Sequence, residues 1–88
     1  MRDLKGLQAE LEKYNGKDVS IRFDGSLKAF MIIENAKCIV TYKTLLIGNI
    51  EKDNQEFQID LDEVIDIEIG IQIILEVNGN YRIYIYNR

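Results

Sequence analysis

The sequence predicts one small α+β domain over residues 1–88, with a short N-terminal helix (3–14) followed by a β-rich body (17–88). Three observations carry this prediction. The first residues follow helical spacing, the second half of the chain alternates apolar and polar residues, and the composition holds fifteen isoleucines and no proline. β-branched side chains favour the pleated surface of a sheet, and without proline no strand loses a ladder donor. Eighty-eight residues suit a single domain.

The N-terminal segment has the i, i+3, i+4 spacing of one apolar helix face. The apolar positions on this face are Leu4, Leu7, Leu11 and Tyr14. Asp3 is placed to cap the start, and Asn15-Gly16 supplies residues that tolerate the positive φ of a helix end. A helix this short needs a surface to pack against, and the sheet is the only one that the sequence offers.

A period of two begins after residue 17, and Asp-Gly-Ser at 24–26 is a strong turn signal. A three-residue loop at 24–26 pairs Phe23 with Leu27 and keeps the apolar side chains of both strands on one face. A two-residue loop sets Ile21 against Lys28 instead. The hydrophobic pattern therefore favours the three-residue loop.

The strand after this turn carries apolar residues on both faces, because Phe30 and Ile32 lie opposite the hydrophobic face already described. This pattern indicates that the strand is covered on both sides, with the N-terminal helix as the second cover. Two further strands are expected over 37–43 and 45–51, followed by a polar turn that reaches Gln55.

The clearest pattern begins at Phe57, where odd-numbered positions are apolar and even-numbered positions are mostly polar as far as Ile85. Such alternation is typical of a sheet with one face in a core. The alternation breaks at Glu63, which predicts a corner over Leu61–Val64. Gly70 predicts a second bend.

The Asn-Gly pair at 78–79 is typical of a two-residue hairpin turn, which sets Leu75 opposite Arg82. A three-residue loop over 78–80 instead pairs Leu75 with Ile83 and keeps the apolar face continuous. The last residue of that loop is an asparagine, which tolerates the left-handed conformation required there. We therefore expect the three-residue loop.

One helix followed by about six or seven antiparallel strands predicts a small barrel or a curled roll, since curling protects strand edges. An SH3-like or Sm-like barrel preceded by a helix fits this order of elements. A pleckstrin-homology-like roll fits the strand count but requires a C-terminal helix, whereas this chain ends in a predicted strand. These are comparisons of architecture alone.

Catalytic chemistry has little support in the sequence. Histidine is absent, which removes the commonest general base near neutral pH and the commonest metal ligand. Cys38 is the only cysteine and lies in an apolar run, where a thiol acts as a small hydrophobe. We expect no enzymatic activity, no catalytic or metal-binding residues and no cofactor.

The chain has no apolar run long enough for a signal peptide or a membrane helix, so we expect a cytoplasmic protein.

Charge divides unevenly along the chain. The net charge of −4 is the sum of +2 over residues 1–44 and −6 over residues 45–88. An acidic row occupies even-numbered positions at Asp60, Asp62, Asp66 and Glu68. Three interpretations stay open for this row: a solvated strand face, a surface for a basic partner, or a divalent-cation site, which takes oxygen ligands.

The terminal strand carries an aromatic and cationic stripe on one face, formed by Arg82, Tyr84, Tyr86 and Arg88. Arginine and tyrosine are favoured at binding surfaces. In the alternative interpretation, the tyrosines cover a second apolar layer and the arginines pair with the acidic row. A terminal strand is also often an edge strand, which invites pairing with a second copy of the chain as a homodimer.

The leading hypothesis is a non-enzymatic protein-binding or regulatory module that uses the stripe and the acidic row. Residue types with AT-rich codons outnumber those with GC-rich codons by 39 to 13, which is typical of a low-GC bacterium, its phages or its mobile elements. The alternative is an Sm-like small barrel that binds nucleic acid, since phosphate contacts need a cationic surface. Its basic residues are Lys17, Arg22, Lys28, Lys37 and Lys43. No membrane partner is expected.

Overall fold

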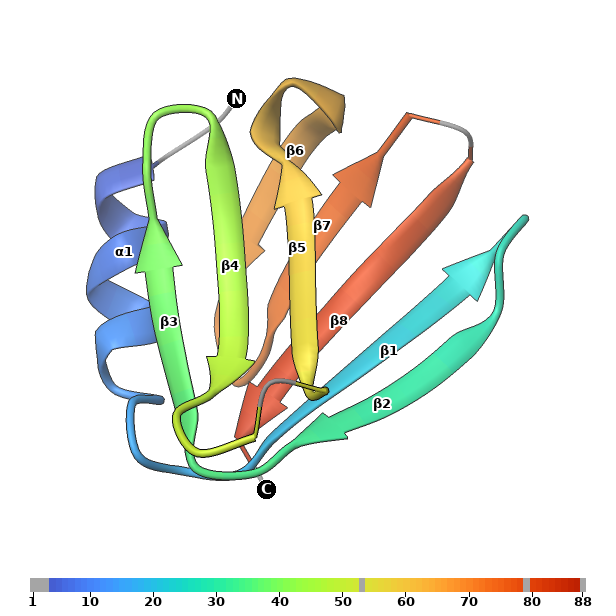
Figure 1. The fold of residues 1–88 in the computed structure, drawn as a ribbon. Coiled ribbons are helices and arrows are strands. Elements are labelled where there is room, and N and C mark those ends of the chain that lie inside the picture. Colours follow the sequence, from blue (N-terminus) through green and yellow to red (C-terminus); the bar gives the residue numbers. More distant parts are fainter. Residues whose placement is uncertain (1–3, 53, 79, 88) are drawn as a thin grey trace.

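The computed structural model describes residues 4–52, 54–78 and 80–87 and contains one helix followed by eight strands (Figure 1). A short 3-10 turn, η1 (Leu61–Glu63), separates the fifth and sixth strands. The other elements are α1 (Leu4–Glu12), β1 (Val19–Gly25), β2 (Ala29–Ile33), β3 (Ala36–Val40), β4 (Thr44–Asn49), β5 (Glu56–Asp60), β6 (Val64–Ile69), β7 (Ile73–Val77) and β8 (Tyr81–Asn87).

The strands form two antiparallel sheets. The large sheet has the order β2-β1-β8-β7-β6, and the small sheet has the order β3-β4-β5. Figure 1 shows the small sheet lying across one face of the large sheet, with α1 beside β3. The helix contacts both β3 of the small sheet and β6 of the large sheet. None of the described helical residues forms a segment long and apolar enough to cross a membrane.

The core lies between the two sheets and under α1, because side chains alternate across each strand and the apolar set of each sheet faces inward. Large fully buried side chains come from all three layers: Leu7, Leu11, Ile21, Leu45, Ile47, Ile73, Leu75, Ile83 and Ile85. The odd-numbered apolar positions predicted from the alternation supply core residues from β5, β7 and β8. The prediction is wrong for Ile65, Ile69 and Ile71, which are exposed. The pairing of β6 with β7 shifts register beside Ile65, Ile69 ends the edge strand β6, and Ile71 lies in the turn that follows it.

The predicted α+β class and the antiparallel sheet are confirmed, but the small barrel is not. The described strands form two separate sheets rather than one closed ring, and they number eight rather than six or seven. The predicted edge position of the terminal strand is wrong, because β8 pairs with β1 on one side and β7 on the other. The apolar alternation of β8 is compatible with either position, so it could not decide between them.

The helix is close to the predicted range, with Leu7, Leu11 and Tyr14 buried. Gly16 has a φ of 80° just beyond it, as expected for a helix end, and Asp3 lies outside the described residues. The helix packs mainly against β3 and β6. The predicted second cover of β2 is therefore wrong, and Phe30 is 55% exposed.

The hairpin of β1 and β2 has a longer loop than predicted. Phe23 pairs with Ala29 rather than with Leu27, so the loop spans residues 24–28. The physical reason is that β1 continues to pair with β8 as far as Gly25, which holds the start of the expected loop inside a strand. The shift is two residues, so the predicted apolar faces survive.

The hairpin of β7 and β8 is confirmed in its register. Leu75 pairs with Ile83 and Val77 with Tyr81, and Asn80 has the left-handed φ of 66°. Gly79 lies outside the described residues. The predicted corner is η1 followed by β6, and Gly70 lies in the turn that joins β6 to β7.

Candidate functional site

The outer face of the large sheet is the surface turned away from the small sheet. On β8, Ile83 and Ile85 point into the core, so Arg82, Tyr84 and Tyr86 point to the outer face. The strand register places Arg22 of β1 opposite Tyr84 on this face. Arg88, the fourth residue of the predicted stripe, lies outside the described residues.

The centre of the outer face is a stacked pair. The Arg22 guanidinium carbon lies 4.4 Å from the centroid of the Tyr84 ring, which is cation–π geometry. Phe30 of β2 lies on the other side of Arg22 in the register and is half-exposed. Stacking orients the guanidinium and the ring, so this part of the surface presents cationic and aromatic groups in a defined arrangement.

Arg82 lies at the acidic end of the outer face. The register sets it between Asp24 of β1 and Glu76 of β7. A hydrogen bond with Tyr84, followed by the nearby carboxylates of Glu76 and Glu68, raises the pKa of the Arg82 guanidinium. Arg82 therefore lies among acidic neighbours, and of these three carboxylates only Glu68 belongs to the predicted acidic row.

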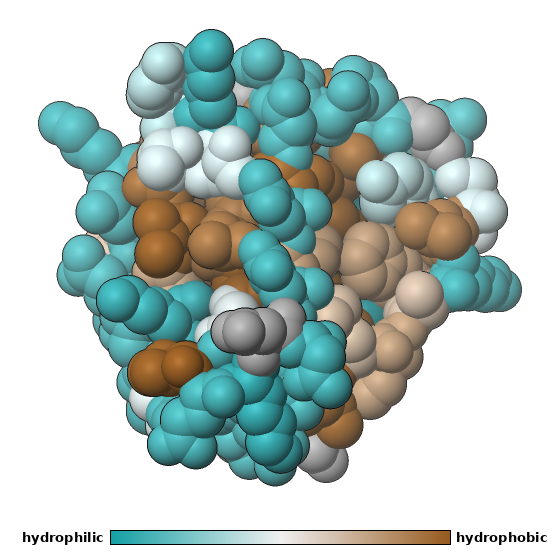
Figure 2. Space-filling model, viewed as in Figure 1, coloured by the Kyte–Doolittle hydropathy of each residue, from teal (hydrophilic) through white to brown (hydrophobic). Residues whose placement is uncertain are grey.

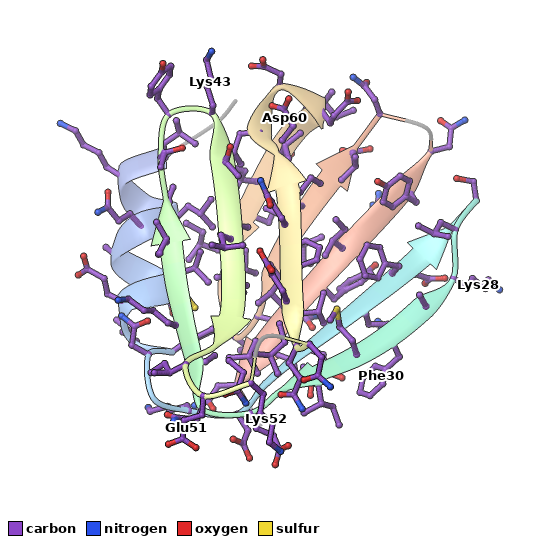
Figure 3. All side chains as sticks on the ribbon, viewed as in Figure 1. Lys28, Phe30, Lys43, Glu51, Lys52 and Asp60 are labelled. Atoms are coloured by element: carbon purple, nitrogen blue, oxygen red, sulfur yellow. The ribbon has the colours of Figure 1, made fainter. Side chains whose placement is uncertain are left out.

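The acidic row divides between two places. Asp66 and Glu68 lie on the outer face, where they line a hollow of about 100 Å³ with Ile74, Glu76 and Arg82. Asp60 ends β5 on the small sheet, at the opposite side of the core (Figure 3). Asp62 lies in η1, where its backbone N–H donates to Asp60 Oδ1 at 2.9 Å. The corner at η1 breaks the row because it carries the chain from one sheet to the other.

Within residues 4–52, 54–78 and 80–87, no three acidic, cysteine or histidine side chains gather as a metal site.

A wider hollow of about 450 Å³ opens at the Arg82 end of β8. Its walls combine opposite charges with apolar groups. They include Asp24, Ile65, Glu76, Tyr81, Arg82 and Tyr84. Such a mixture suits a polar side chain or backbone segment of a partner more than a purely apolar ligand.

Ser20 identifies a part of the outer face that is closed to solvent. The residue is 1% exposed, and its hydroxyl has no hydrogen-bond partner among the described residues. Its cross-strand neighbours on the same face are Ile32 and Tyr86. Tyr86 therefore lies beside a buried position, and Tyr84 and Tyr86 are both half-buried, whereas Arg22 and Arg82 are exposed.

A third hollow, of about 310 Å³, lies on the outer face of the small sheet. Ile39, Leu46 and Ile50 supply its apolar part, and Lys37 and Glu56 lie beside them. Figure 2 shows apolar side chains over the small sheet and over the strip of the large sheet beside it. This surface was not predicted from the sequence, although Ile39, two residues after Lys37 on the solvent side of β3, was a signal for it.

The basic residues predicted for nucleic acid lie on different parts of the molecule. Arg22 is on the outer face of the large sheet, whereas Lys37 is on the small sheet. Figure 3 shows Lys28 at the far end of β2 and Lys43 in the turn between β3 and β4. These described residues do not form one continuous cationic surface.

Cys38 lies on β3 and packs against the core, and burial raises the pKa of its thiol to about 11. We expect a thiol reagent at pH 8 to label Cys38 in the folded chain about tenfold more slowly than in the unfolded chain, because few thiolates form. Because the pKa of Cys38 is higher in the folded chain, the neutral thiol stabilises the fold relative to the ionised thiol. This contribution to the free energy of unfolding is complete below about pH 9 and is lost as the pH rises toward 11. Labelling at equal rates in buffer and in denaturant contradicts the burial.

Comparisons of the chain with protein-family models, with curated proteins and with solved structures found no match. The fold and the site together define a class: an open two-sheet α+β domain whose large sheet presents an aromatic and cationic outer face with an acidic border.

Proposed function

We propose that this chain is a non-enzymatic protein-binding or regulatory module of the cytoplasm of a low-GC bacterium or one of its mobile elements, and that it binds its partner through the outer face of the large sheet. The observation that carries the proposal is the Arg22–Tyr84 stack with the half-exposed Phe30 beside it. Tyrosine and arginine dominate the energetics of many protein interfaces because their large rigid groups lose little entropy on binding.

The charges on this face support a protein partner more than a nucleic acid. Arg22 and Arg82 provide positive charge, but Asp24, Glu76 and Glu68 surround Arg82. A polyanion requires a surface of one sign, whereas a protein interface tolerates a mixed border around an aromatic centre. The absence of histidine from the sequence agrees with a binding role rather than a catalytic one.

Affinity capture from a lysate of the native host tests the proposal. The chain is used in three forms: wild type, Arg82→Ala/Tyr84→Ala on the outer face, and Lys37→Ala/Ile39→Ala on the small sheet as a matched control. Tyr86 is left unchanged because it is the cross-strand neighbour of the buried Ser20. Circular dichroism melting first verifies that all three fold alike.

We expect wild type and the small-sheet control to recover the same proteins, and the outer-face variant to lose at least one of them by tenfold or more in quantitative mass spectrometry. If the outer-face variant recovers everything that wild type recovers, the proposed surface is wrong. A partner lost only from the small-sheet control moves the interface to the hollow beside Ile39.

A further inference from the structure

Strand β2 is an apolar edge of the large sheet. Its sequence, Ala29–Ile33, contains no charged residue, and among the described strands it pairs only with β1. Figure 3 shows Phe30 and Lys28 projecting from this edge away from the body of the molecule. Proteins protect exposed edges with charges, proline or bulges, because an open edge of this kind readily pairs with another strand. The regular pairing of β2 with β1 contains no bulge.

The hydrogen bonds identify which backbone groups face outward at this edge. Just beyond the pair of Gly25 with Tyr81, the Ser26 N–H donates to the Asn80 carbonyl at 3.1 Å. Even-numbered residues of β1 therefore exchange hydrogen bonds with β8, and odd-numbered residues exchange them with β2. It follows that the N–H and C=O groups of Phe30 and Ile32 point away from β1. The Glu34 N–H agrees, because it donates to Gln55 Oε1 rather than to β1.

We propose that β2 pairs antiparallel with β2 of a second copy of this chain, about a twofold axis at Met31. In this register the outward backbone groups of Phe30 exchange hydrogen bonds with those of Ile32 in the other copy. By the twofold symmetry, Ile32 exchanges the same hydrogen bonds with Phe30 of the other copy. The register also sets Lys28 of each copy opposite Glu34 of the other. Opposite charges directly across a ladder stabilise the pairing.

This charge complementarity favours a second copy of the chain as the strand that pairs with β2, and it favours one register of that pairing. The edge reads Lys28, five apolar residues, then Glu34, so a second copy in the antiparallel direction complements it at both ends. Moving the axis to Phe30 sets Lys28 opposite Ile32. Moving it to Ile32 sets Glu34 opposite Phe30. The Glu34 carboxylate accepts a long hydrogen bond from Gln55 Nε2 at 3.4 Å and lies 3.7 Å from Lys52 Nζ. Its side chain is 55% exposed, so it is still accessible to Lys28 of the other copy.

The dimer joins two large sheets into one, which brings the two outer faces side by side. The inference goes beyond the proposed function and rests on the edge alone. A chain that captures its partner but stays monomeric contradicts the dimer without affecting the proposed function. A chain that dimerises but captures no partner contradicts the proposed function without affecting the dimer.

Sedimentation equilibrium at low salt tests the pairing and its charges together. We expect wild type to form a dimer at micromolar concentration. Lys28→Glu and Glu34→Lys each place like charges opposite each other at both ends of the ladder, so each is expected to weaken the dimer about tenfold. The double variant Lys28→Glu/Glu34→Lys reverses both charges and is expected to restore it. A wild-type monomer at high micromolar concentration overturns the proposal, as does a double variant no stronger than the single ones.

Disulfide formation tests the register. Residues on the twofold axis form a non-hydrogen-bonded pair with Cα atoms about 4.5 Å apart, which is within the range that a disulfide bridges. In a Cys38→Ala background, Met31→Cys is expected to form a covalent dimer under mild oxidation. Ala29→Cys is the matched control on the same side of β2, and its two copies are about 13 Å apart. Equal cross-linking of the two variants, or faster cross-linking at position 29, overturns the register and with it the proposal.

Discussion

Replacing Ile83 by alanine is expected to lower the free energy of unfolding by about 2–5 kcal/mol. Ile83 is fully buried on β8, the central strand of the large sheet, between Phe23 of β1 and Leu75 of β7. The substitution removes three carbon atoms from the core, and the strands on either side restrict how far the structure can close the cavity. Urea denaturation of wild type and variant, followed by circular dichroism, measures the difference.

Ile39→Ala is the control for this prediction, because Ile39 lies on β3 and is 42% exposed. It is expected to change the free energy of unfolding by less than about 1 kcal/mol. A cost at position 83 no larger than the cost at position 39 is incompatible with β8 as a buried central strand.

Gly25→Ala is expected to cost about 2 kcal/mol or more. Gly25 ends β1 with a φ of 132°, a conformation that L side chains rarely adopt. A Cβ at this position lies 2.5 Å from the Asn80 carbonyl oxygen, which is backbone and therefore not free to rotate away. Thermal melting of the variant measures the loss of stability.

Gly70→Ala provides the contrast. No atom lies within 4 Å of a Cβ at this position in the turn between β6 and β7. The loss of glycine's freedom in the unfolded chain is expected to leave this variant at least as stable as wild type. Equal effects at positions 25 and 70 contradict the close approach of Gly25 to Asn80.

The hydrophobic pattern of the sequence predicted the features that depend on residues close together in the chain. The alternation from Phe57 onward defined the inward faces of β5, β7 and β8 but failed along β6, where the register shifts beside Ile65. The rule of apolar continuity selected the observed register of β7 and β8. The same rule chose the correct faces in β1 and β2 but the wrong loop. A shift of two residues leaves the faces unchanged, so the pattern alone cannot exclude it.

Pairings between distant segments were not predictable in this way. The chain separates β1 from β8 by more than fifty residues, and no local signal indicates that they are neighbours. This one pairing made the terminal strand central and lengthened the loop after Phe23. It also left β2 as the edge. The division of the strands between two sheets has the same origin, and it moved the helix to the side of the molecule.

The candidate site was predictable in part. Alternation placed Arg82, Tyr84 and Tyr86 on one face of a strand, and the structure keeps them there. Sequence reasoning missed that Arg22 stacks on Tyr84, because the contact depends on the pairing of β1 with β8. The acidic row failed as a unit because the strands on either side of η1 belong to different sheets.

The most direct test of the central claim is the affinity of the captured partner for single variants of the purified chain, measured by isothermal titration calorimetry. Tyr84→Ala removes the ring on which Arg22 stacks and is expected to weaken binding by about thirtyfold, as for a central interface residue. Ile39→Ala, on the small sheet, is expected to leave the dissociation constant within about twofold. Unchanged binding of Tyr84→Ala, with the loss at Ile39→Ala instead, contradicts the outer face of the large sheet as the binding surface.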